Sequence, residues 1–271
     1  MSQTNEQQVF NQLAEVIDEY NSMHIAHQLD YDKFYLYSII THSTAIEGST
    51  VTEIENQLLF DEGISANKPI YEQLMNLDLK AAYERSFELV KQHTQITPGI
   101  LCELSSLVMK NTGSVYNTIG GTFSSAKGEL RLLNVSAGRG GKSYTAWQKL
   151  PQKLEEFCSW LNAELKTIAE KPIQEQYAFS FLVHYKLVQI HPWADGNGRM
   201  SRLLMNVIQY EAGIIPSIIK KENRAEYIHS LASSQDKDDP TEFLHFMFSH
   251  HIRNLSEQIE EYKTSLEMSG S

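Results

Sequence analysis

The densest group of chemically capable side chains lies in the segment His191–Arg202, which reads His-Pro-Trp-Ala-Asp-Gly-Asn-Gly-Arg-Met-Ser-Arg. Gly196 and Gly198 allow positive φ and close backbone approach, so successive amide N–H groups can bind an anion at the start of the following helix. Arg199 and Arg202 stand three residues apart on that helix, and we expect them to project from the same face as donors to phosphate oxygens. The segment therefore predicts a phosphate-binding site.

Three further side chains of this segment indicate what is done with the phosphate. Asp195 would be repelled by a bare phosphate, but its position becomes favourable if Mg²⁺ bridges the carboxylate and the phosphates. Asn197 can donate to a phosphate oxygen, and His191 can accept a hydroxyl proton near neutral pH. The alternative is a glycine-rich turn in which Asp195 caps the next helix, but such a turn needs only one or two of these residues.

The segment resembles the signature of the Fic family of AMP-transferring enzymes, His-Pro-Phe-x-Asp/Glu-Gly-Asn-Gly-Arg-x-x-Arg. Trp193 stands where the family usually has Phe, and it keeps an aromatic anchor of larger size. The resemblance extends over about residues 30 to 250 and implies an all-α fold, a Fic-type helical core with a small β-hairpin flap. The matching residues are His191, Pro192, Asp195, Gly196, Asn197, Gly198, Arg199 and Arg202.

The resemblance also implies a role for each residue. His191 would deprotonate a Ser, Thr or Tyr hydroxyl of a target protein, and Asp195 would hold Mg²⁺ on the α- and β-phosphates of ATP. The hydroxyl would attack the α-phosphorus, pyrophosphate would leave and AMP would remain on the target. The implied ATP-binding residues, with Arg202 on the γ-phosphate, are Gly196, Asn197, Gly198, Arg199, Met200, Ser201 and Arg202.

A second motif, Ser43-Thr44-Ala45-Ile46-Glu47-Gly48, ends a predicted helix at about 31–48. Glu47 falls in the last turn, where the helix dipole disfavours an acidic side chain by about 0.3–1 kcal/mol. The stretch resembles the Fic inhibitory motif, Ser/Thr-x-x-x-Glu-Gly/Asn, at Ser43, Glu47 and Gly48. The resemblance implies an N-terminally auto-inhibited protein, in which Glu47 pairs with Arg202 and blocks the seat of the γ-phosphate.

The glycine-rich stretch 113–144 breaks the helical pattern, and we predict a β-hairpin or flap there with Glu129–Val135 as its best strand. The following residues, Ser136–Ser143, nearly spell a P-loop, except that a serine takes the first glycine position. A P-loop NTPase is the alternative interpretation of this part of the chain. In the Fic interpretation, the flap aligns the target segment by strand addition through Ser143, Tyr144 and Thr145.

Two downstream features have both a functional and a structural interpretation. Residues 223–227 are similar to the family region in which a tyrosine, here Tyr227, borders the adenine, and Gln235 stands where some relatives have asparagine. Tyr227 is equally compatible with helix packing. A cluster of histidines could hold a metal, but the aromatic residues among them favour an amphipathic packing helix: His245, His250 and His251.

Apolar residues at helical spacing predict helices on both sides of the site. Gly48 is expected to end the second helix, and Thr50 with Glu53 resembles a capping box that opens the third. We predict an N-terminal helical region at 1–95, a catalytic core at 96–255 and a helix end and tail at 256–271. The predicted helices span 8–27, 31–47, a segment from about 51, 69–92, 98–110, 149–168, 173–190, 198–212, 222–234 and 240–263.

The composition excludes several other classes of protein. The 271 residues carry 23 Lys and Arg against 34 Asp and Glu, a net charge of −11, which argues against binding to nucleic acid or to an anionic membrane surface. Cys102 and Cys158 lie far apart with no metal-ligand spacing, so neither a disulfide scaffold nor a zinc ribbon is expected. The polar N-terminus and the absence of long apolar runs predict a cytoplasmic protein without membrane spans.

Two further functions remain open from the sequence. Glu47 could instead orient a water that hydrolyses AMP from a modified protein, or the site could only sense ATP in a non-catalytic regulator. The expected cofactor is Mg²⁺. The expected partners are ATP and an unidentified target protein, and a homodimer is left open.

Overall fold

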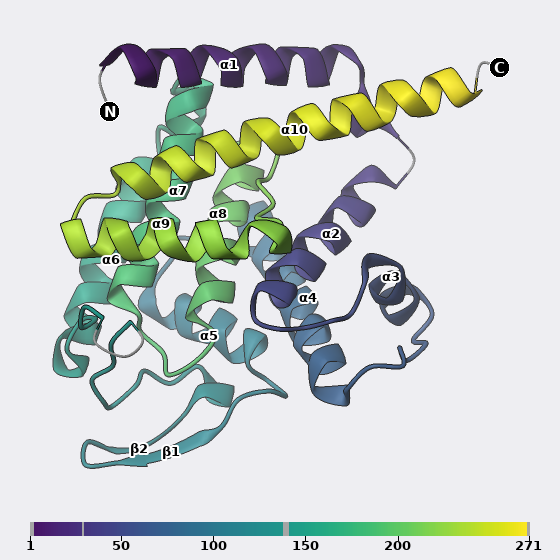
Figure 1. Ribbon diagram of the computed structural model, residues 1–271. Helices are drawn as coiled ribbons and strands as arrows, with labels where there is room; N and C mark the ends of the chain where they lie inside the picture. The colour runs from purple at the N-terminus through teal and green to yellow at the C-terminus, as the bar shows by residue number, and fades with distance from the viewer. Residues whose placement is uncertain (1–2, 29, 138–140, 270–271) are drawn as a thin grey trace.

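Two long helices, α7 (Ile173–Ile190) and α8 (Asn197–Glu211), pack against each other in the middle of the chain's fold (Figure 1). The computed structural model describes residues 3–28, 30–137 and 141–269. Nearly every side chain of α8 between Asn197 and Gln209 is buried, because other helices cover it on all sides. The loop between α7 and α8, which contains most of the predicted site, is therefore held between two helices of the buried core.

The described residues are mostly helical, as predicted, with one small antiparallel sheet. The helices are α1 (Gln3–Ser22), α2 (Tyr31–Ile46), α3 (Glu53–Asp61), α4 (Ile70–Lys91), α5 (Pro98–Val108), α6 (Leu150–Leu165), α7, α8, α9 (Arg224–Lys237) and α10 (Thr241–Ser269). Short 3₁₀ helices are η1 (Ile25–His27), η2 (Ser125–Lys127), η3 (Trp147–Lys149), η4 (Ile168–Glu170) and η5 (Lys221–Asn223). The strands are β1 (Val115–Thr118) and β2 (Gly121–Ser124).

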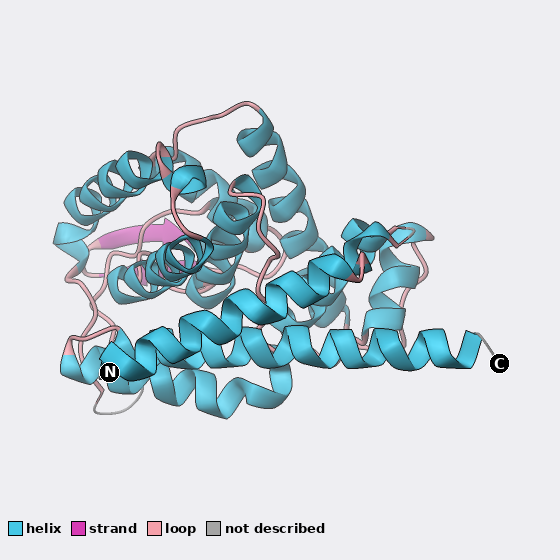
Figure 2. Ribbon diagram, turned by 90° about the horizontal axis from the view of Figure 1, so that it is seen from above, coloured by secondary structure: helices cyan, strands magenta, loops and turns pink. Residues whose placement is uncertain are grey.

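The apolar side chains form two buried clusters on opposite sides of the α7–α8 pair. One cluster joins α2, α4, α5 and α6 to this pair, and the other joins α1, α9 and α10 to it. Helices α1 and α10 lie side by side across one end of the fold, and the C-terminal part of α10 extends beyond the body (Figures 1 and 2). Residues before the predicted boundary at 95 contribute to both clusters, so the N-terminal helices share the core of the catalytic region.

Helix α10 is longer than predicted. It continues to Ser269 and not only to the predicted end at 263, so the predicted helix end and tail at 256–271 is helical as far as the structure describes it, with residues 270 and 271 outside the described part. His250 and His251 are buried on this helix and pack against the rings of Phe246 and Tyr177. In the described part of the chain, no cluster of three or more His, Cys, Asp or Glu side chains is arranged to hold a metal ion.

The capping box at the start of α3 lies two residues later than predicted. Thr52 has an extended backbone and its hydroxyl accepts from the Glu55 amide, while the Glu55 carboxylate accepts from the Thr52 amide. The Thr50 amide and hydroxyl instead donate to the Glu72 carboxylate on α4. A tertiary partner for Thr50 therefore moves the start of the helix to the next matching pair in the sequence.

The predicted strand at Glu129–Val135 is wrong. The hairpin lies earlier, where β1 and β2 pair with Val115 opposite Ser124 and Thr118 opposite Gly121. The backbone of residues 129–135 is taken up by other partners, because the Arg131 amide donates to the Pro192 carbonyl and the Leu132 carbonyl accepts from the Thr118 hydroxyl. Arg131 binds the α7–α8 loop and Leu132 lies against Gly120 and Gly121 of the hairpin, so these residues follow tertiary contacts and not a strand ladder.

Cys102 and Cys158 are both free thiols. Among the described residues, no helix combines the length and the apolar character that crossing a bilayer requires.

Candidate active site

Two left-handed residues shape the loop between α7 and α8. His191 ends α7 with φ 51° and ψ 62°, and Gly196 precedes α8 with φ 82°. A side chain at Gly196 would collide with Met109, because a Cβ there would lie 2.8 Å from the Met109 Sδ. The amides of residues 197–199 have no acceptor within the helix, whereas the Met200 amide donates to the Gly196 carbonyl over 2.9 Å. The loop therefore presents three first-turn amides to an anion, as the glycine spacing indicates.

Two hydrogen bonds between the Asn197 side chain and the Trp193 backbone hold this loop together. The Asn197 side chain accepts from the Trp193 amide at 3.1 Å and donates to the Trp193 carbonyl at 2.8 Å. The Trp193 ring is fully buried and its indole N–H donates to the Gly128 carbonyl, so the larger aromatic at this position has a partner that Phe could not use. Asn197 holds the loop in this structure, and its predicted bond to a phosphate oxygen stays a prediction.

Replacing Asn197 with alanine should lower the melting temperature of the protein by about 4–8 °C. The change leaves a buried amide and carbonyl of Trp193 unpaired, which we expect to cost about 2 kcal/mol of unfolding free energy in a chain of this size. Thermal denaturation of the variant measures the effect. Asn11→Ala, at an exposed position of α1, is the control, and an equal melting temperature for Asn197→Ala and the control would contradict this role.

The His191 imidazole is held neutral at the end of α7. Burial lowers its pKa to about 4, the Arg131 charge acts in the same direction, and the Val188 backbone opposes both. The ring of Tyr144 stacks on the imidazole, with the ring centres 3.9 Å apart and the planes 14° from parallel. A neutral imidazole at this place can accept a proton from an incoming hydroxyl.

Arg202 leaves α8 toward the end of α2 and binds the predicted inhibitory residues. Its Nε donates to the Ser43 Oγ at 2.8 Å, and its Nη2 donates to the Ser43 carbonyl at 3.0 Å and to the Glu47 Oε1 at 2.6 Å. Burial opposes ionisation of Glu47, but the charge and hydrogen bond of Arg202, together with the charges of Arg199 and Arg224, outweigh it and hold the pKa of that carboxyl below its usual range. The contact between Glu47 and Arg202 is thus a charged pair inside the site.

The Glu47 carboxylate also lies directly over the start of α8. A Cβ added to Gly198 would be 2.7 Å from the Glu47 Oε1 and 3.0 Å from the Arg202 Nη1. The carboxylate therefore stands beside the first-turn amides, at the place where an anionic ligand would meet the helix.

The backbone after α2 fixes Glu47 in this position. Gly48 has φ 104°, its amide donates to the Ala45 carbonyl, and the Ser49 amide donates to the Thr44 carbonyl. These two bonds form a Schellman motif, which explains why a glycine follows the glutamate. The prediction that Gly48 ends the helix is confirmed.

A buried polar network that the sequence did not reveal supports the same turn. The Asn76 side chain on α4 accepts from the Thr44 hydroxyl at 2.7 Å and donates to the Ser49 hydroxyl at 3.1 Å, and Asn56 on α3 donates to Asn76 at 2.9 Å. Neither asparagine is exposed to solvent. Polar residues in the middle of apolar helix faces were the signal for this network, but their partners come from three different elements.

The prediction that Arg199 and Arg202 project from the same face of α8 is wrong, because the two side chains bind different helices. The Arg199 guanidinium is 2% exposed and donates to the Val108 carbonyl and to the Met109 Sδ at the end of α5, and it lies 3.7 Å from the Asp195 Oδ1. Asp195 itself is half exposed and its Oδ1 accepts from the Gly196 amide at 2.6 Å. A solvent-facing carboxylate beside the first-turn amides fits Mg²⁺, which takes one or two carboxylates together with substrate phosphates.

Met200 and Ser201 are fully buried on α8, so their side chains belong to the core. Tyr227 is also buried, with 1% of its surface exposed, and its hydroxyl lies 3.4 Å from the Arg202 Nη1 and 2.9 Å from the His184 Nε2. In this structure Tyr227 contacts the Arg202 guanidinium with its hydroxyl and its ring. Its predicted place beside the adenine stays a prediction.

The flap segment, residues 129–137 and 141–145, passes over His191. Val135–Ala137 and Lys142–Tyr144 run antiparallel, with the Ala137 amide bonded to the Lys142 carbonyl and the Tyr144 amide to the Val135 carbonyl. Residues 138–140 of the P-loop-like sequence lie outside the described residues. Residues 144–146 are not helical and the next helix, η3, starts at Trp147, while Lys142 donates to the Gln235 carbonyl at 2.7 Å. The described residues therefore do not form the strand–loop–helix geometry of a P-loop.

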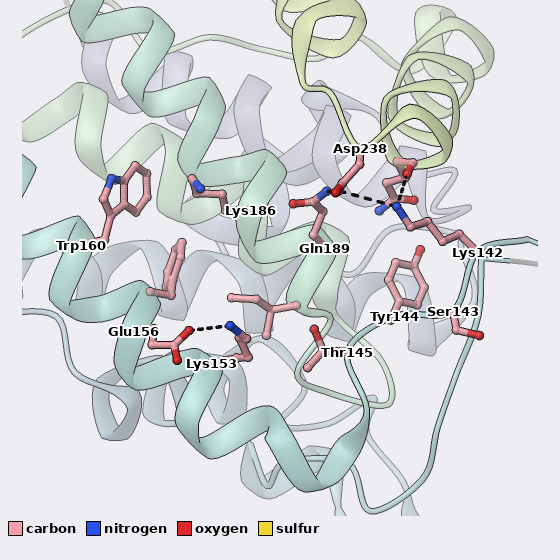
Figure 3. Close-up of a pocket in the computed structure, with 13 residues that line it drawn as sticks. Lys142, Ser143, Tyr144, Thr145, Lys153, Glu156, Trp160, Lys186, Gln189 and Asp238 are labelled. Carbon is pink, nitrogen blue, oxygen red and sulfur yellow. Dashed lines mark hydrogen bonds and ion pairs between the residues drawn. The ribbon is translucent and has the colours of Figure 1, made fainter.

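A cavity of about 630 Å³ opens beside the flap segment (Figure 3). Tyr144 and Thr145 form one side, and Trp160 with Lys186 above its ring at 4.9 Å forms the opposite side. The cavity brings the three predicted flap residues together at one edge. The remaining lining residues are Lys142, Ser143, Lys153, Glu156, Phe157, Gln189, Ile190, Gln235 and Asp238.

The fold and the loop together define a helical protein that presents an anion-binding helix start beside a neutral imidazole. Residues 95–209 match the family model described as the Fic/DOC family. This segment, which contains the His191–Arg202 loop and most of α8, is a Fic/DOC domain.

Two curated relatives and a solved structure agree with this assignment. The chain is 28% identical over 256 residues, 92% of its length, to "Protein adenylyltransferase fic-1" of Caenorhabditis elegans, and it covers 46% of that protein. It is 34% identical over 203 residues, 73% of its length, to "Protein adenylyltransferase Fic" of Drosophila erecta and covers 37% of it. A solved Fic-1 fragment from C. elegans superposes with a TM-score of 0.77 at 25% identity, covering 97% of this chain and 74% of that one. The chain spans less than half the length of these curated relatives.

Proposed function

We propose that this protein is a protein adenylyltransferase, which transfers AMP from MgATP to a Ser, Thr or Tyr hydroxyl of a target protein and is auto-inhibited by Glu47. The observation that carries the proposal is the Glu47 carboxylate at the start of α8, 2.6 Å from Arg202. An acidic group of the chain's own already binds where the triphosphate would bind. The names of the relatives, which are protein adenylyltransferases, support the same reaction.

The chain's residues supply positioning and charge stabilisation for this transfer. His191 accepts the proton of the target hydroxyl, whose oxygen attacks the α-phosphorus as the bond to the pyrophosphate breaks. The first-turn amides of α8 and the Arg202 guanidinium stabilise the negative charge on the phosphates. Asp195 would hold Mg²⁺, which neutralises charge on the α- and β-phosphates when it is bound.

Glu47 inhibits by competition in this proposal. Arg202 cannot bind a γ-phosphate while it donates to Glu47, and a second negative charge at the same amides is repelled. The target protein, which is unidentified, would dock along Ser143, Tyr144 and Thr145 and place side chains in the neighbouring cavity.

The intact mass of the Glu47→Gly protein after incubation with MgATP tests the proposed reaction. We expect a gain of one AMP on a residue of the chain itself or on an added target, and none with His191→Ala in the same background. An unchanged mass in both cases, with ATP bound, would instead favour a nucleotide sensor without transfer.

Hydrolysis of AMP from a modified protein is the second candidate, and the position of Glu47 favours it specifically. The carboxylate stands next to the anion site, where it could orient a water for attack on phosphorus. Glu47→Gly separates the two functions, because it should activate transfer and abolish removal. A pre-modified target incubated with wild-type protein would lose AMP only if hydrolysis is the main activity.

The pH dependence of transfer should follow the low pKa of His191. The imidazole must be neutral to accept a proton, and with a pKa of about 4 it stays neutral well below pH 6.5. We therefore expect transfer by Glu47→Gly to be nearly flat from pH 8 down to about pH 5 and to fall toward pH 4. Initial rates across this range measure it, and an acidic limb centred near pH 6.5 would show that the base is not held as in this structure.

A further inference from the structure

Arg131 is a buried cation at the junction of the flap segment and the α7–α8 loop. Its side chain has no exposed surface. The Nε donates to the His191 carbonyl at 2.7 Å, and the Nη2 lies 3.5 Å from the Ile190 carbonyl, so one side of the guanidinium binds the end of α7. The other side donates to the Leu133 carbonyl at 2.6 Å and to the Thr145 carbonyl.

The hydrogen-bond acceptors of this guanidinium are backbone carbonyls and not acidic side chains. Among the described residues no carboxylate forms an ion pair with Arg131. The carbonyls at the end of α7 have no partner within the helix and carry the negative end of its dipole, which suits a cation there. The Arg131 amide also donates to the Pro192 carbonyl at 3.1 Å, so backbone and side chain of one residue hold three consecutive residues, 190–192.

This arrangement bears on His191 because that residue has a left-handed backbone. A residue other than glycine populates this conformation sparsely and keeps it only when its surroundings impose it. The Arg131 bond to the His191 carbonyl is such a constraint. The bond to the Thr145 carbonyl fixes the flap relative to the end of α7. It thereby also fixes the Tyr144 ring, which stacks on the imidazole.

We propose that Arg131 is a positioning residue for His191: its guanidinium ties the flap to the end of α7 and thereby fixes the turn that aims the imidazole. The proposal rests on the proposed adenylyl transfer, since it assigns Arg131 a role in that reaction. Arg131 touches neither the nucleotide site nor the target hydroxyl, and it acts through the backbone of the base.

The charged and titratable groups seen in contact with His191 among the described residues are Arg131, which donates to its carbonyl, and Tyr144, which stacks on its ring. Asp195 follows in the same loop and lies 3.7 Å from Arg199, and Asp238 at the end of α9 lies 3.6 Å from Lys142. Of these groups, Arg131 is the one whose charge lowers the pKa of His191. Loss of Arg131 should therefore misplace the imidazole and also make it easier to protonate.

The test compares Arg131→Met and Arg131→Lys in the full chain carrying Glu47→Gly. We expect Arg131→Met to lower kcat by about 100-fold through misplacement of the base, with the KM for MgATP changed by less than about threefold. Its acidic limb should move to higher pH. Arg131→Lys should restore the acidic limb but not kcat, because it keeps the charge without the fork of donors. Arg85→Met, which removes a surface arginine paired with Glu88 and Glu103, is the matched control.

A second measurement does not depend on transfer. An NMR titration of the His191 imidazole, assigned by its loss in His191→Ala, should give a pKa that rises toward 6.5 in Arg131→Met and stays near 4 in Arg85→Met. If the Glu47→Gly chain transfers no AMP, the proposed function fails while this titration still tests Arg131. Folded Arg131→Met with unchanged kcat and titration would overturn the proposal. Activity lost by both Arg131 variants only in proportion to their folded fraction would overturn it as well.

Discussion

Replacing His191 with alanine should lower AMP transfer by about 1000-fold while MgATP binding stays within a few fold of the parent chain. The parent is Glu47→Gly, in which transfer is measurable. Removal of a positioned general base costs 10²- to 10⁴-fold in typical enzymes, and the phosphate contacts of this site come from other groups. The first-turn amides of α8 and the Arg202 guanidinium do not depend on the imidazole. Radiolabelled transfer and nucleotide titration calorimetry measure the two effects separately.

The backbone of His191 requires a second variant beside alanine. Alanine is strained at φ 51°, so His191→Ala removes the base and also disturbs the turn. Asparagine adopts this conformation more readily, and His191→Asn removes the base while keeping the turn. We expect both variants to lose transfer and His191→Asn to keep the parent melting temperature. His245→Ala, at an exposed position on α10, is the control. Transfer by His191→Asn at the parent rate would eliminate His191 as the base.

The parts of the site that follow from local sequence could be predicted. Positive φ at Gly196 and Gly48 and the start of α8 depend on a few neighbouring residues, and the structure has them where the spacing indicated. The helix α7, at Ile173–Ile190, has the predicted limits because its apolar faces are long and regular. The pairing of Glu47 with Arg202 came from the family resemblance, since nothing in either local segment specifies a partner more than 150 residues away.

Long-range partners explain what the sequence could not predict. The spacing of Arg199 and Arg202 indicated one shared face, but long side chains turn toward the nearest acceptors, and these lie on α5 for Arg199 and on α2 for Arg202. The same holds for Arg131, a single charge in the apolar run Leu130–Leu133. Such a residue signals a buried partner, yet its partners are carbonyl groups, which every residue has. Only the folded chain identifies which of them it binds.

Replacing Glu47 with glycine should raise the rate of AMP transfer by about 100-fold at limiting MgATP. In the wild-type chain a phosphate must displace the Glu47 carboxylate from Arg202, and truncating one partner of a hydrogen-bonded charge pair typically costs about 2–5 kcal/mol. In the variant, Arg202 is left without that partner, so this free energy becomes available to the γ-phosphate. A change of about 2.7 kcal/mol corresponds to 100-fold. Initial rates of labelled AMP transfer measure the gain.

Matched variants separate the charge of Glu47 from its backbone. Glu47→Ala removes the carboxylate without adding glycine flexibility and should activate about as well as Glu47→Gly. Glu47→Gln keeps the shape but not the charge and should activate less. Glu53→Gln, at an exposed carboxylate near the start of α3, should leave the rate unchanged. Equal rates for wild type, Glu47→Ala and Glu47→Gly would mean that the pair with Arg202 does not restrain transfer.

The same pair predicts opposite effects on stability with and without nucleotide. Without MgATP, Glu47→Ala leaves Arg202 buried and uncompensated, which should cost about 2 kcal/mol, or about 5 °C in melting temperature. This cost is smaller than that of breaking a fully buried pair, because the Glu47 side chain is 35% exposed. With MgATP at about 100 times its Kd, the variant should regain about 2.7 kcal/mol, whereas wild type, which binds weakly at the same concentration, should gain much less. Melting temperatures of both chains with and without MgATP therefore report the competition directly, and an equal shift in both would show that Glu47 and the γ-phosphate do not share Arg202.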